Sequence, residues 1–258
     1  MPVASIIAER VFEARDSLRR RLAWLLARRL RKIPVHVAII PDGNRRWARR
    51  RRLKPWHGHA AGYLRVRRAL DFLWDLGVRV VTLYAMSYEN CLSRPREEKR
   101  LLYALILKAV DDILADKRVA KGLVRVKPAG ELSLLPGPVQ KRLYYLREAT
   151  ASNKPYTLNV GVCYGGEWEI VEAYREALGS GIGIRGYEDL RRLMVFGDSP
   201  RPDLVIRAGG EKRISNFLLP HIAYSELYFS DTLWPDFDEL ELVKALLDYQ
   251  SRERRYGR

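Results

Sequence analysis

The sequence has few cysteines and no long apolar run. Cys91 and Cys163 are its only cysteines and form no C-x-x-C pair, so neither a zinc ribbon nor a disulfide framework is expected, and a reduced cytoplasmic compartment is predicted. No apolar stretch approaches the roughly 20 residues that a membrane-spanning helix needs. The first residues also lack the apolar core and small-residue cleavage site of a secretory signal. The sequence therefore predicts a cytoplasmic protein, soluble or at most bound to a membrane surface.

Nucleotide-binding patterns and amide side chains are also scarce. The chain contains no G-x-x-x-x-G-K-[ST] and no G-x-G-x-x-G, so P-loop and Rossmann sites are unsupported. Only 5 Asn and 2 Gln occur among 258 residues, and this scarcity of thermolabile amides predicts a thermophilic source. The excess of arginine, 36 against 11 lysines, is compatible with that origin and equally with a GC-rich genome.

Positive charge is what the chain has in excess. Apolar residues make up 47% of the sequence, which is ordinary for a globular protein, but the formal net charge is +16. A balance of this kind implies an anionic partner, which is a nucleic acid, an acidic lipid surface or a phosphorylated substrate. Charge alone does not choose among the three.

Residues 1–34 form a basic amphipathic segment, in which one helix is predicted over 5–32. Apolar side chains recur at steps of three and four from Ile7 to Leu25 and so share one face. The other face is rich in arginine. Such a helix either packs on its own domain, which is our prediction, or binds anionic lipid. Partial cover of the apolar face would allow both.

From residue 35 to 258, short β-branched runs alternate with helical stretches. Strands are predicted at 35–40, 79–86, 123–127, 156–162, 204–207 and 227–229. Helices are predicted at 59–76, 96–118, 138–152, 166–178, 215–222 and 238–254. This alternation, without a dividing linker, predicts a single α/β domain with a central, mostly parallel sheet surrounded by helices. In such sheets, ligands bind beyond the carboxyl ends of the strands.

Phosphate-binding side chains follow the first predicted strand. A carboxylate, a glycine, an amide and two guanidinium groups come in succession: Asp42, Gly43, Asn44, Arg45 and Arg46. Arginine pairs bind phosphate oxygens bidentately, and an ionised Asp42 is suited to hold Mg²⁺. The alternative is a strand-end turn with solvated arginines, and His59, taken singly, could be a helix cap. Together with Gly58-His59, the pattern favours a diphosphate site with a metal.

Two other strand ends carry comparable chemistry. The second strand runs into Ser87-Tyr88-Glu89-Asn90, with Arg94 beyond, although any one of these could be a helix or turn cap. The fifth strand ends at Arg207, and Gly-Gly, Lys212, Arg213 and Ser215 follow before the next predicted helix. Glu226, eleven residues on, is a candidate second metal ligand. Two anion pockets and two carboxylates indicate two phosphorylated substrates meeting at one Mg²⁺.

These segments together resemble the cis-prenyltransferase family, which includes undecaprenyl diphosphate synthases and dehydrodolichyl diphosphate synthases. The resemblance runs from about residue 35 to the end, and its pieces occur in the family's order. They are HVAIIPDGNRRWA, GHAAGY, LYAMSYEN with RPREE, LNVGVCYGGEWEI, DLVIRAGGEKRISNFLLPHIAYSELYF, LWPDFDE and RERRYG. The resemblance implies a parallel sheet and helices that enclose a hydrophobic tunnel, and a homodimer.

The resemblance also implies roles for individual residues. Asp42 is expected to be the catalytic aspartate, Asn90 to act in proton removal, and Glu226 to join Asp42 around Mg²⁺. The allylic diphosphate is expected on Gly43, Asn44, Arg45, Arg46, Trp47, His59 and Arg94. Further substrate contacts are expected at Ser87, Tyr88 and Glu89. The isopentenyl diphosphate is expected on Arg207, Arg213, Ile214 and Ser215.

The implied reaction is a Mg²⁺-dependent condensation of isopentenyl diphosphate with an allylic prenyl diphosphate, which makes a long Z-polyprenyl diphosphate. This product would be the precursor of a glycosyl carrier lipid. The sequence departs from the family pattern at Met86, Cys91 and Lys212, and these departures bear on primer choice and on any third metal contact. The C-terminal Arg255-Tyr256-Gly257 matches the family's Arg-x-Gly motif, which reaches the partner subunit's site.

Two other functions would also fit parts of the sequence. A nucleic-acid-binding protein would account for the charge and for the run Arg49–Arg52, but no helix-turn-helix, RNP or zinc pattern is present. A non-catalytic scaffold subunit is a third hypothesis, against which the retention of Asp42, Asn90 and Arg207 counts. We therefore predict the two diphosphates as partners and no nucleic acid.

Overall fold

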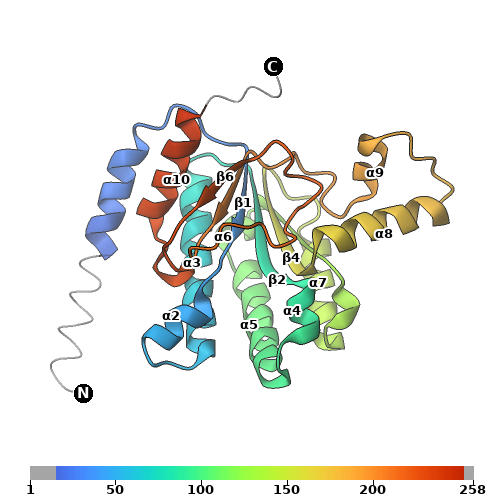
Figure 1. Cartoon of the computed structure of the whole chain (residues 1–258), viewed down its shortest axis with the longest axis horizontal. Coiled ribbons are helices and arrows are strands. Elements are labelled where there is room, and N and C mark those ends of the chain that lie inside the picture. Colours follow the sequence, from blue (N-terminus) through green and yellow to red (C-terminus); the bar gives the residue numbers. More distant parts are fainter. Residues whose placement is uncertain (1–15, 253–258) are drawn as a thin grey trace.

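Six parallel strands form the centre of the computed structural model, which describes residues 16–252 (Figure 1). The strand order is β3-β4-β2-β1-β5-β6. The strands are β1 (His36–Ile40), β2 (Val80–Ser87), β3 (Val124–Ala129), β4 (Tyr156–Tyr164), β5 (Leu204–Arg207) and β6 (Glu226–Phe229). The helices are α2 (Asn44–Arg50), α3 (Pro55–Asp75), α4 (Tyr88–Ser93), α5 (Arg96–Leu114), α6 (Lys117–Ala120), α7 (Gly137–Ala149), α8 (Gly166–Gly179), α9 (Tyr187–Leu193) and α10 (Glu239–Ser251). The predicted α/β fold with a central parallel sheet is confirmed.

The parallel pairing brings the carboxyl ends of the strands to one edge of the sheet. β1 is buried at all of its positions, as expected for an apolar strand covered on both faces. Ile40, at the end of β1, pairs with Arg207 at the end of β5. Asp42 therefore follows β1 directly beside the end of β5, as the sequence pattern requires for a shared site.

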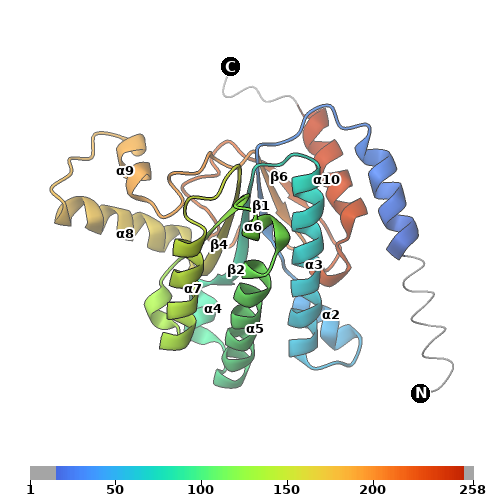
Figure 2. The same cartoon turned by 180° about the vertical axis from the view of Figure 1, so that it is seen from behind.

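The two faces of the sheet carry separate apolar clusters. The larger cluster includes Val37 and Ile39 and packs against α3, α5, α7 and α10. Figure 2 shows α3, α5 and α7 in front of the sheet. The smaller cluster contains the alternate residues Ala38 and Ile40 and is closed by Phe217 and its neighbours. Side chains alternate in direction along a strand, so one short strand supplies both clusters.

The N-terminal segment is helical over residues 16–27, and residues 1–15 of the predicted 5–32 helix lie outside the described residues. Ala23 and Ala27 are buried, and the ring of Trp24 meets that of Phe72 in α3 edge to face. The helix therefore packs on the domain as predicted, but through a different face, because Leu18, Leu22 and Leu25 of the predicted apolar face are 68%, 42% and 58% exposed. Within residues 16–252, no helix is both long and apolar enough to span a membrane.

The helix predicted over 215–222 is absent, and the prediction was wrong. Turns and bends fill this stretch, and Ser215, Asn216 and Leu218 have positive φ angles of 49°, 61° and 49°. Positive φ is costly for residues other than glycine and is retained only where the surroundings fix it. Here Phe217 and Leu218 are fully buried in the smaller cluster, so packing on the sheet overrides the local helical pattern.

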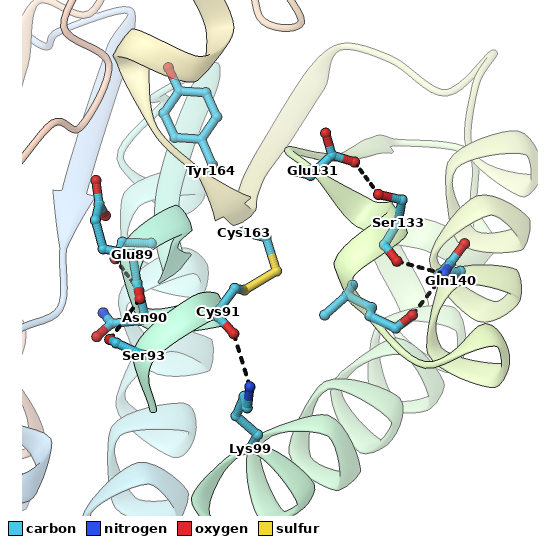
Figure 3. The surroundings of a disulfide bond; sticks show 12 residues. Glu89, Asn90, Cys91, Ser93, Lys99, Glu131, Ser133, Gln140, Cys163 and Tyr164 are labelled. Atoms are coloured by element: carbon cyan, nitrogen blue, oxygen red, sulfur yellow. Dashed lines mark hydrogen bonds between the residues drawn. A yellow bond between two sulfur atoms is a disulfide. The ribbon is translucent and has the colours of Figure 1, made fainter. Parts of the chain in front are cut away.

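Cys91 and Cys163 form a disulfide, contrary to our expectation (Figure 3). Their Cα atoms lie 5.4 Å apart, although 72 positions separate them in sequence. The reason is topological: α4 follows β2 directly, β2 pairs with β4, and Cys163 lies at the end of β4. Sequence spacing alone could not reveal this pairing, because it depends on which strands are neighbours.

Candidate active site

A cavity of about 510 Å³ opens at the carboxyl edge of the sheet. Its walls come from the ends of β1, β2 and β5 and from α2, α3 and α4. Small-molecule sites typically measure about 300–1,000 Å³, so this cavity is large enough for a ligand. Nine of the predicted site residues line it: Asp42, Asn44, His59, Ser87, Glu89, Asn90, Arg94, Arg207 and Ser215.

Asp42 lies between two guanidinium groups. Its Oδ2 is 3.0 Å from Nη2 of Arg207 and 3.2 Å from Nη2 of Arg46. Arg46 also pairs with Glu211, across 3.4 Å, in the loop after β5. The Asp42 side chain is 31% exposed, so the carboxylate remains open to a ligand in the cavity.

Arg207 is the most enclosed cation on the cavity wall, with only 4% of its surface exposed. Its Nη1 donates to Oγ of Ser215 at 2.8 Å and to the carbonyl of Arg213. Its Nε is buried and has no hydrogen-bond partner among the described residues. Buried donors are almost always satisfied in folded proteins, so an unpaired guanidinium N–H beside a cavity favours an oxyanion ligand.

Arg94 and His59 on the cavity wall form a second polar group together with Glu98 behind them. Nη1 of Arg94 lies 2.6 Å from Oε1 of Glu98 and 3.4 Å from Nε2 of His59. Burial, and then the charge of Arg94, lower the pKa of His59, so its imidazole is mainly neutral at pH 7. The Nε of Arg94 is also buried without a partner in the described chain. This group is therefore a second candidate anion site, formed by α3 and the segment after α4.

Helix α4 is fixed at several points, which sets the position of Asn90. Oγ of Ser87 caps the helix by accepting the backbone N–H of Asn90 at 3.1 Å. Oε1 of Glu89 accepts a hydrogen bond of 3.0 Å from Nδ2 of Asn216, in the loop after β5. The disulfide at Cys91 ties the same helix to β4 (Figure 3). Asn90 is thus held on the cavity wall by neighbours on both sides of it in the sequence.

Two glycines of α3 determine where Asn44 lies. A Cβ added at Gly58 would be 2.0 Å from the carbonyl oxygen of Asn44, and one added at Gly62 would be 2.3 Å from its Oδ1. Real Cβ atoms do not approach other atoms so closely, so neither position has room for a side chain. Because α3 can approach so closely, the start of α2 is pressed against it, and Asn44 lines the cavity.

A second, mostly apolar cavity lies between the sheet and helices α3, α5 and α7. It extends from the carboxyl edge of the sheet to Trp74, Val119 and Val124, near the amino end of β3. The two cavities share six lining residues: Pro41, Asn44, His59, Ala85, Met86 and Leu102. A polar chamber therefore borders directly on an apolar one.

Besides Glu226, seven predicted residues do not line the polar cavity: Gly43, Arg45, Arg46, Trp47, Tyr88, Arg213 and Ile214. Arg46 still contacts the cavity through Asp42. Trp47 instead donates from Nε1 to Asp236 at 2.8 Å, and Arg51 stacks on its ring. Arg213 is mostly exposed and pairs with Glu211. Gly43 has a φ of +106° and caps α2, so its role is to shape the turn after Asp42.

Glu226 is not brought to Asp42. It begins β6 opposite Leu204, whereas Arg207, the neighbour of Asp42, pairs with Phe229 three residues further on. Three residues of strand span roughly 10 Å. The Glu226 carboxylate pairs instead with Arg252, at 2.9 Å. Within this chain, the two carboxylates predicted to share a metal ion therefore lie at opposite ends of the sheet.

Seven cavity residues were not predicted as site residues, and three of them are Tyr84, Ala85 and Asn216. Tyr84 donates to the backbone carbonyls of Tyr164 and Ser215 and stacks on Phe217, so it supports the loop after β5. Ala85 is exposed although it lies within a strand, as expected for a residue that faces a cavity. Asn216 was hidden from sequence reasoning because a helix was predicted where the turn lies.

Comparison with known proteins identifies the family. The sequence model described as "Putative undecaprenyl diphosphate synthase" matches residues 40–257. The chain belongs to the cis-prenyltransferase family. It is accordingly an enzyme that transfers prenyl groups, as the sequence predicted.

Relatives from archaea, bacteria and plants support this membership. A geranylgeranyl-diphosphate-specific tritrans,polycis-undecaprenyl-diphosphate synthase of Methanopyrus kandleri is 42% identical, over 88% of this chain and 86% of that protein. An isoprenyl transferase of Fusobacterium nucleatum is 44% identical, over 88% of this chain and 97% of that protein. The crystal structure of lavandulyl diphosphate synthase from Lavandula x intermedia, in complex with dimethylallyl diphosphate, superposes with a TM-score of 0.80. That pair is 30% identical, over 87% of this chain and 98% of the other.

The close contact between Gly62 and Asn44 predicts a sharp effect of a single methyl group. Gly62→Ala should lower the free energy of unfolding by about 1–3 kcal/mol through overpacking and displace Asn44 from the cavity wall. Chemical denaturation and prenyl-transfer rates measure the two effects. Gly179→Ala is the matched control, because a Cβ there meets no atom within 4 Å. Equal stability of the two variants would contradict the contact.

Proposed function

We propose that the protein condenses isopentenyl diphosphate with an allylic prenyl diphosphate to build a long Z-polyprenyl diphosphate. The observation that best supports this proposal is that a guanidinium-lined cavity and an apolar cavity share part of their walls. A prenyl diphosphate has the same division, with a polyanionic head and an apolar tail. Burial of each added isoprene unit in the apolar cavity would offset its exposure to water.

The two charged groups of the polar cavity suit two diphosphates. Arg94, His59 and Asn44 lie beside the apolar cavity or share its wall, so they suit the allylic substrate, whose tail needs that cavity. Arg207 and Ser215 lie on the side of the loop after β5 and suit isopentenyl diphosphate. The unpaired Nε atoms of Arg94 and Arg207 support an anion at each place.

Asp42 is proposed to hold Mg²⁺ together with oxygens of a bound diphosphate. Mg²⁺ commonly binds to one or two carboxylates and completes its shell with substrate phosphates and water. Among residues 16–252, no three His, Cys, Asp or Glu side chains form a complete metal cage, so a site completed by substrate fits the residues present. The bound ion would supply charge stabilisation for the departing diphosphate.

The remaining steps are proposed for residues that line the cavity or contact Asp42 on its wall. Arg94 and Arg46 stabilise the charge that builds on the allylic diphosphate as the C1–O bond breaks. The isopentenyl double bond attacks C1 of the allylic substrate, which leaves a cationic carbon in the isopentenyl unit. A proton then leaves the carbon next to that centre, and the new Z double bond forms. Asn90 has a neutral amide, which is a poor base, so we propose that it orients the substrate while a diphosphate oxygen accepts the proton.

The primer is proposed to be geranylgeranyl diphosphate, and the product the precursor of a glycosyl carrier lipid. Support for the primer comes from the relatives, several of which are named as geranylgeranyl-diphosphate specific. The proposal of a long product rests on the apolar cavity, which extends from Ala85 to Val119.

The function is tested by incubating the purified protein with Mg²⁺, labelled isopentenyl diphosphate and separate allylic primers. Asp42→Asn should reduce transfer on the order of a hundredfold or more, since it removes the charge beside the reacting diphosphate. The amide keeps an acceptor for Arg207, so the fold should remain. Asp236→Asn, on a carboxylate outside both cavities, is the control. No transfer with any primer by the wild type would favour the scaffold hypothesis.

Ala85 provides a test of the border between the two cavities. Ala85→Phe would place a ring where the cavities meet, so the growing chain should stop after few additions while the first condensation continues. Product lengths by thin-layer chromatography measure this. Ala151→Phe, on an exposed turn, should leave product length unchanged. Full-length products from Ala85→Phe would show that the chain grows elsewhere.

A homodimer is proposed from the exposed apolar side chains of α8. Val171, Tyr174 and Leu178 are 47%, 55% and 66% exposed, and contiguous exposed apolar surface marks association sites. Tyr174→Glu with Leu178→Glu should convert a dimer to a monomer in sedimentation velocity at micromolar concentration. Leu64→Glu on α3, where the leucine is 59% exposed, is the matched control and should leave a dimer. A monomeric wild type would refute the proposal.

A further inference from the structure

The helix at residues 16–27 lies outside the part of the chain that matches the family, which begins at residue 40. It packs along the outside of α10 in both views (Figures 1 and 2). The transfer chemistry takes place at the carboxyl edge of the sheet and uses none of its side chains. Its role therefore has to be sought in its own two faces.

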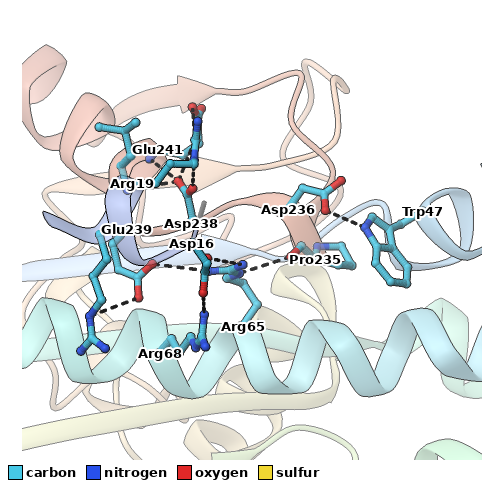
Figure 4. A network of polar contacts seen from close by, with 12 residues as sticks. Asp16, Arg19, Trp47, Arg65, Arg68, Pro235, Asp236, Asp238, Glu239 and Glu241 are labelled. Atoms are coloured by element: carbon cyan, nitrogen blue, oxygen red, sulfur yellow. Dashed lines mark hydrogen bonds and ion pairs between the residues drawn. The ribbon is translucent and has the colours of Figure 1, made fainter. Parts of the chain in front are cut away.

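Ion pairs hold the inner face of this helix to the domain (Figure 4). Asp16 pairs with Arg68 of α3, and Nη2 of Arg19 donates to Oδ1 of Asp238, at the start of α10, at 3.1 Å. Burial of Ala23 and Ala27 completes the contact. These interactions fix which side of the helix points outward.

Three leucines occupy the outward side. Leu18, Leu22 and Leu25 are 68%, 42% and 58% exposed, and their spacing of four and three places them in one row. We call this row the leucine stripe. Exposing three large apolar side chains in one row costs solvation free energy unless something covers them. The stripe is therefore an interaction surface.

Three arginines accompany the stripe: Arg21, Arg28 and Arg29. All are exposed, and no carboxylate of the described residues lies within ion-pair distance of them. By contrast, Arg19 on the inner face pairs with Asp238, so the arginines of this segment without a carboxylate partner among the described residues are exposed ones, in the helix and in the turn that follows it. Exposed apolar side chains and free guanidinium groups in one short segment match the border between acyl chains and anionic headgroups.

Other occupants fit this surface less well. A second copy of the chain docked through this surface would bring the same arginines face to face, and they would repel each other. A nucleic acid would satisfy the arginines but would leave the leucines in water. An anionic lipid surface satisfies both groups at once.

We propose that the helix at residues 16–27 docks the enzyme on anionic membranes, with the leucine stripe inserted among the acyl chains and Arg21, Arg28 and Arg29 on the headgroup phosphates. The helix lies in the membrane surface and does not cross it. This inference does not depend on the transfer reaction, because it rests on a face of the molecule that the reaction does not use.

The test is sedimentation of the full-length protein with vesicles of phosphatidylcholine alone or with one third phosphatidylglycerol. We expect binding to the anionic vesicles that weakens as salt is raised, and little binding to phosphatidylcholine alone. Changing Arg21, Arg28 and Arg29 to Gln should lower the partition coefficient about a hundredfold. Changing Leu18, Leu22 and Leu25 to Gln should lower it about tenfold or more.

Matched controls test whether binding depends on the position of these residues or only on the number of arginines and exposed leucines. Arg49→Gln, Arg50→Gln and Arg52→Gln together remove the same charge from another exposed segment, and Leu53→Gln, Leu64→Gln and Leu134→Gln together change three exposed leucines elsewhere. Both controls should bind nearly as the wild type does, and circular dichroism verifies that every variant is folded. Equal loss in the arginine control would mean that net charge alone attracts the protein. That result, unchanged binding of the stripe variant, or a wild type that ignores anionic vesicles would each overturn the proposal.

Discussion

A buried guanidinium group at the end of β5 is the constraint on which the site depends. A charge with 4% exposure needs polar partners, and the two Nη atoms of Arg207 find theirs in two parts of the chain, after β1 and after β5. It meets Asp42 after β1, the hydroxyl of Ser215 and the carbonyl of Arg213. The strand pairing of β1 with β5 makes this possible, because it ends both strands at the same level. The charge thereby links the sheet's register to the position of the proposed metal ligand.

The border between the polar and apolar cavities depends on small side chains. Gly58 and Gly62 let α2 and α3 meet closely enough to place Asn44 at this border, and Ala85 leaves β2 open toward it. Larger residues at these positions would close the passage or move its walls. The charged residues could bind a diphosphate without this arrangement, but they could not pass an apolar tail inward.

Much of the fold could be predicted from the sequence, because its strands are apolar runs that end in turns rich in charged and polar side chains. Asp42 and Arg207 were both predicted at carboxyl ends of strands for this reason, and the pairing of β1 with β5 then makes them neighbours. The turn at Ser215 and Asn216 could not be predicted, since its backbone is fixed by burial of Phe217 on the sheet. For Glu226, the family resemblance and the fold indicate different positions. Its proximity to Asp42 followed from family resemblance, whereas the strand register places it at the far end of β6.

The disulfide also restricts the conformations that are open to the unfolded protein. Joining residue 91 to residue 163 makes a covalent ring that holds α5, α6, β3, α7 and nearly all of β4. In the chain-entropy view, closing a loop of this length restricts the denatured ensemble by about 4 kcal/mol. As long as the bond is oxidised, α5 and α7, which wall the apolar cavity together with α3, stay inside this ring when the protein unfolds. These helices refold from a segment whose two ends are already joined, at α4 and β4, close to the residues of the polar cavity.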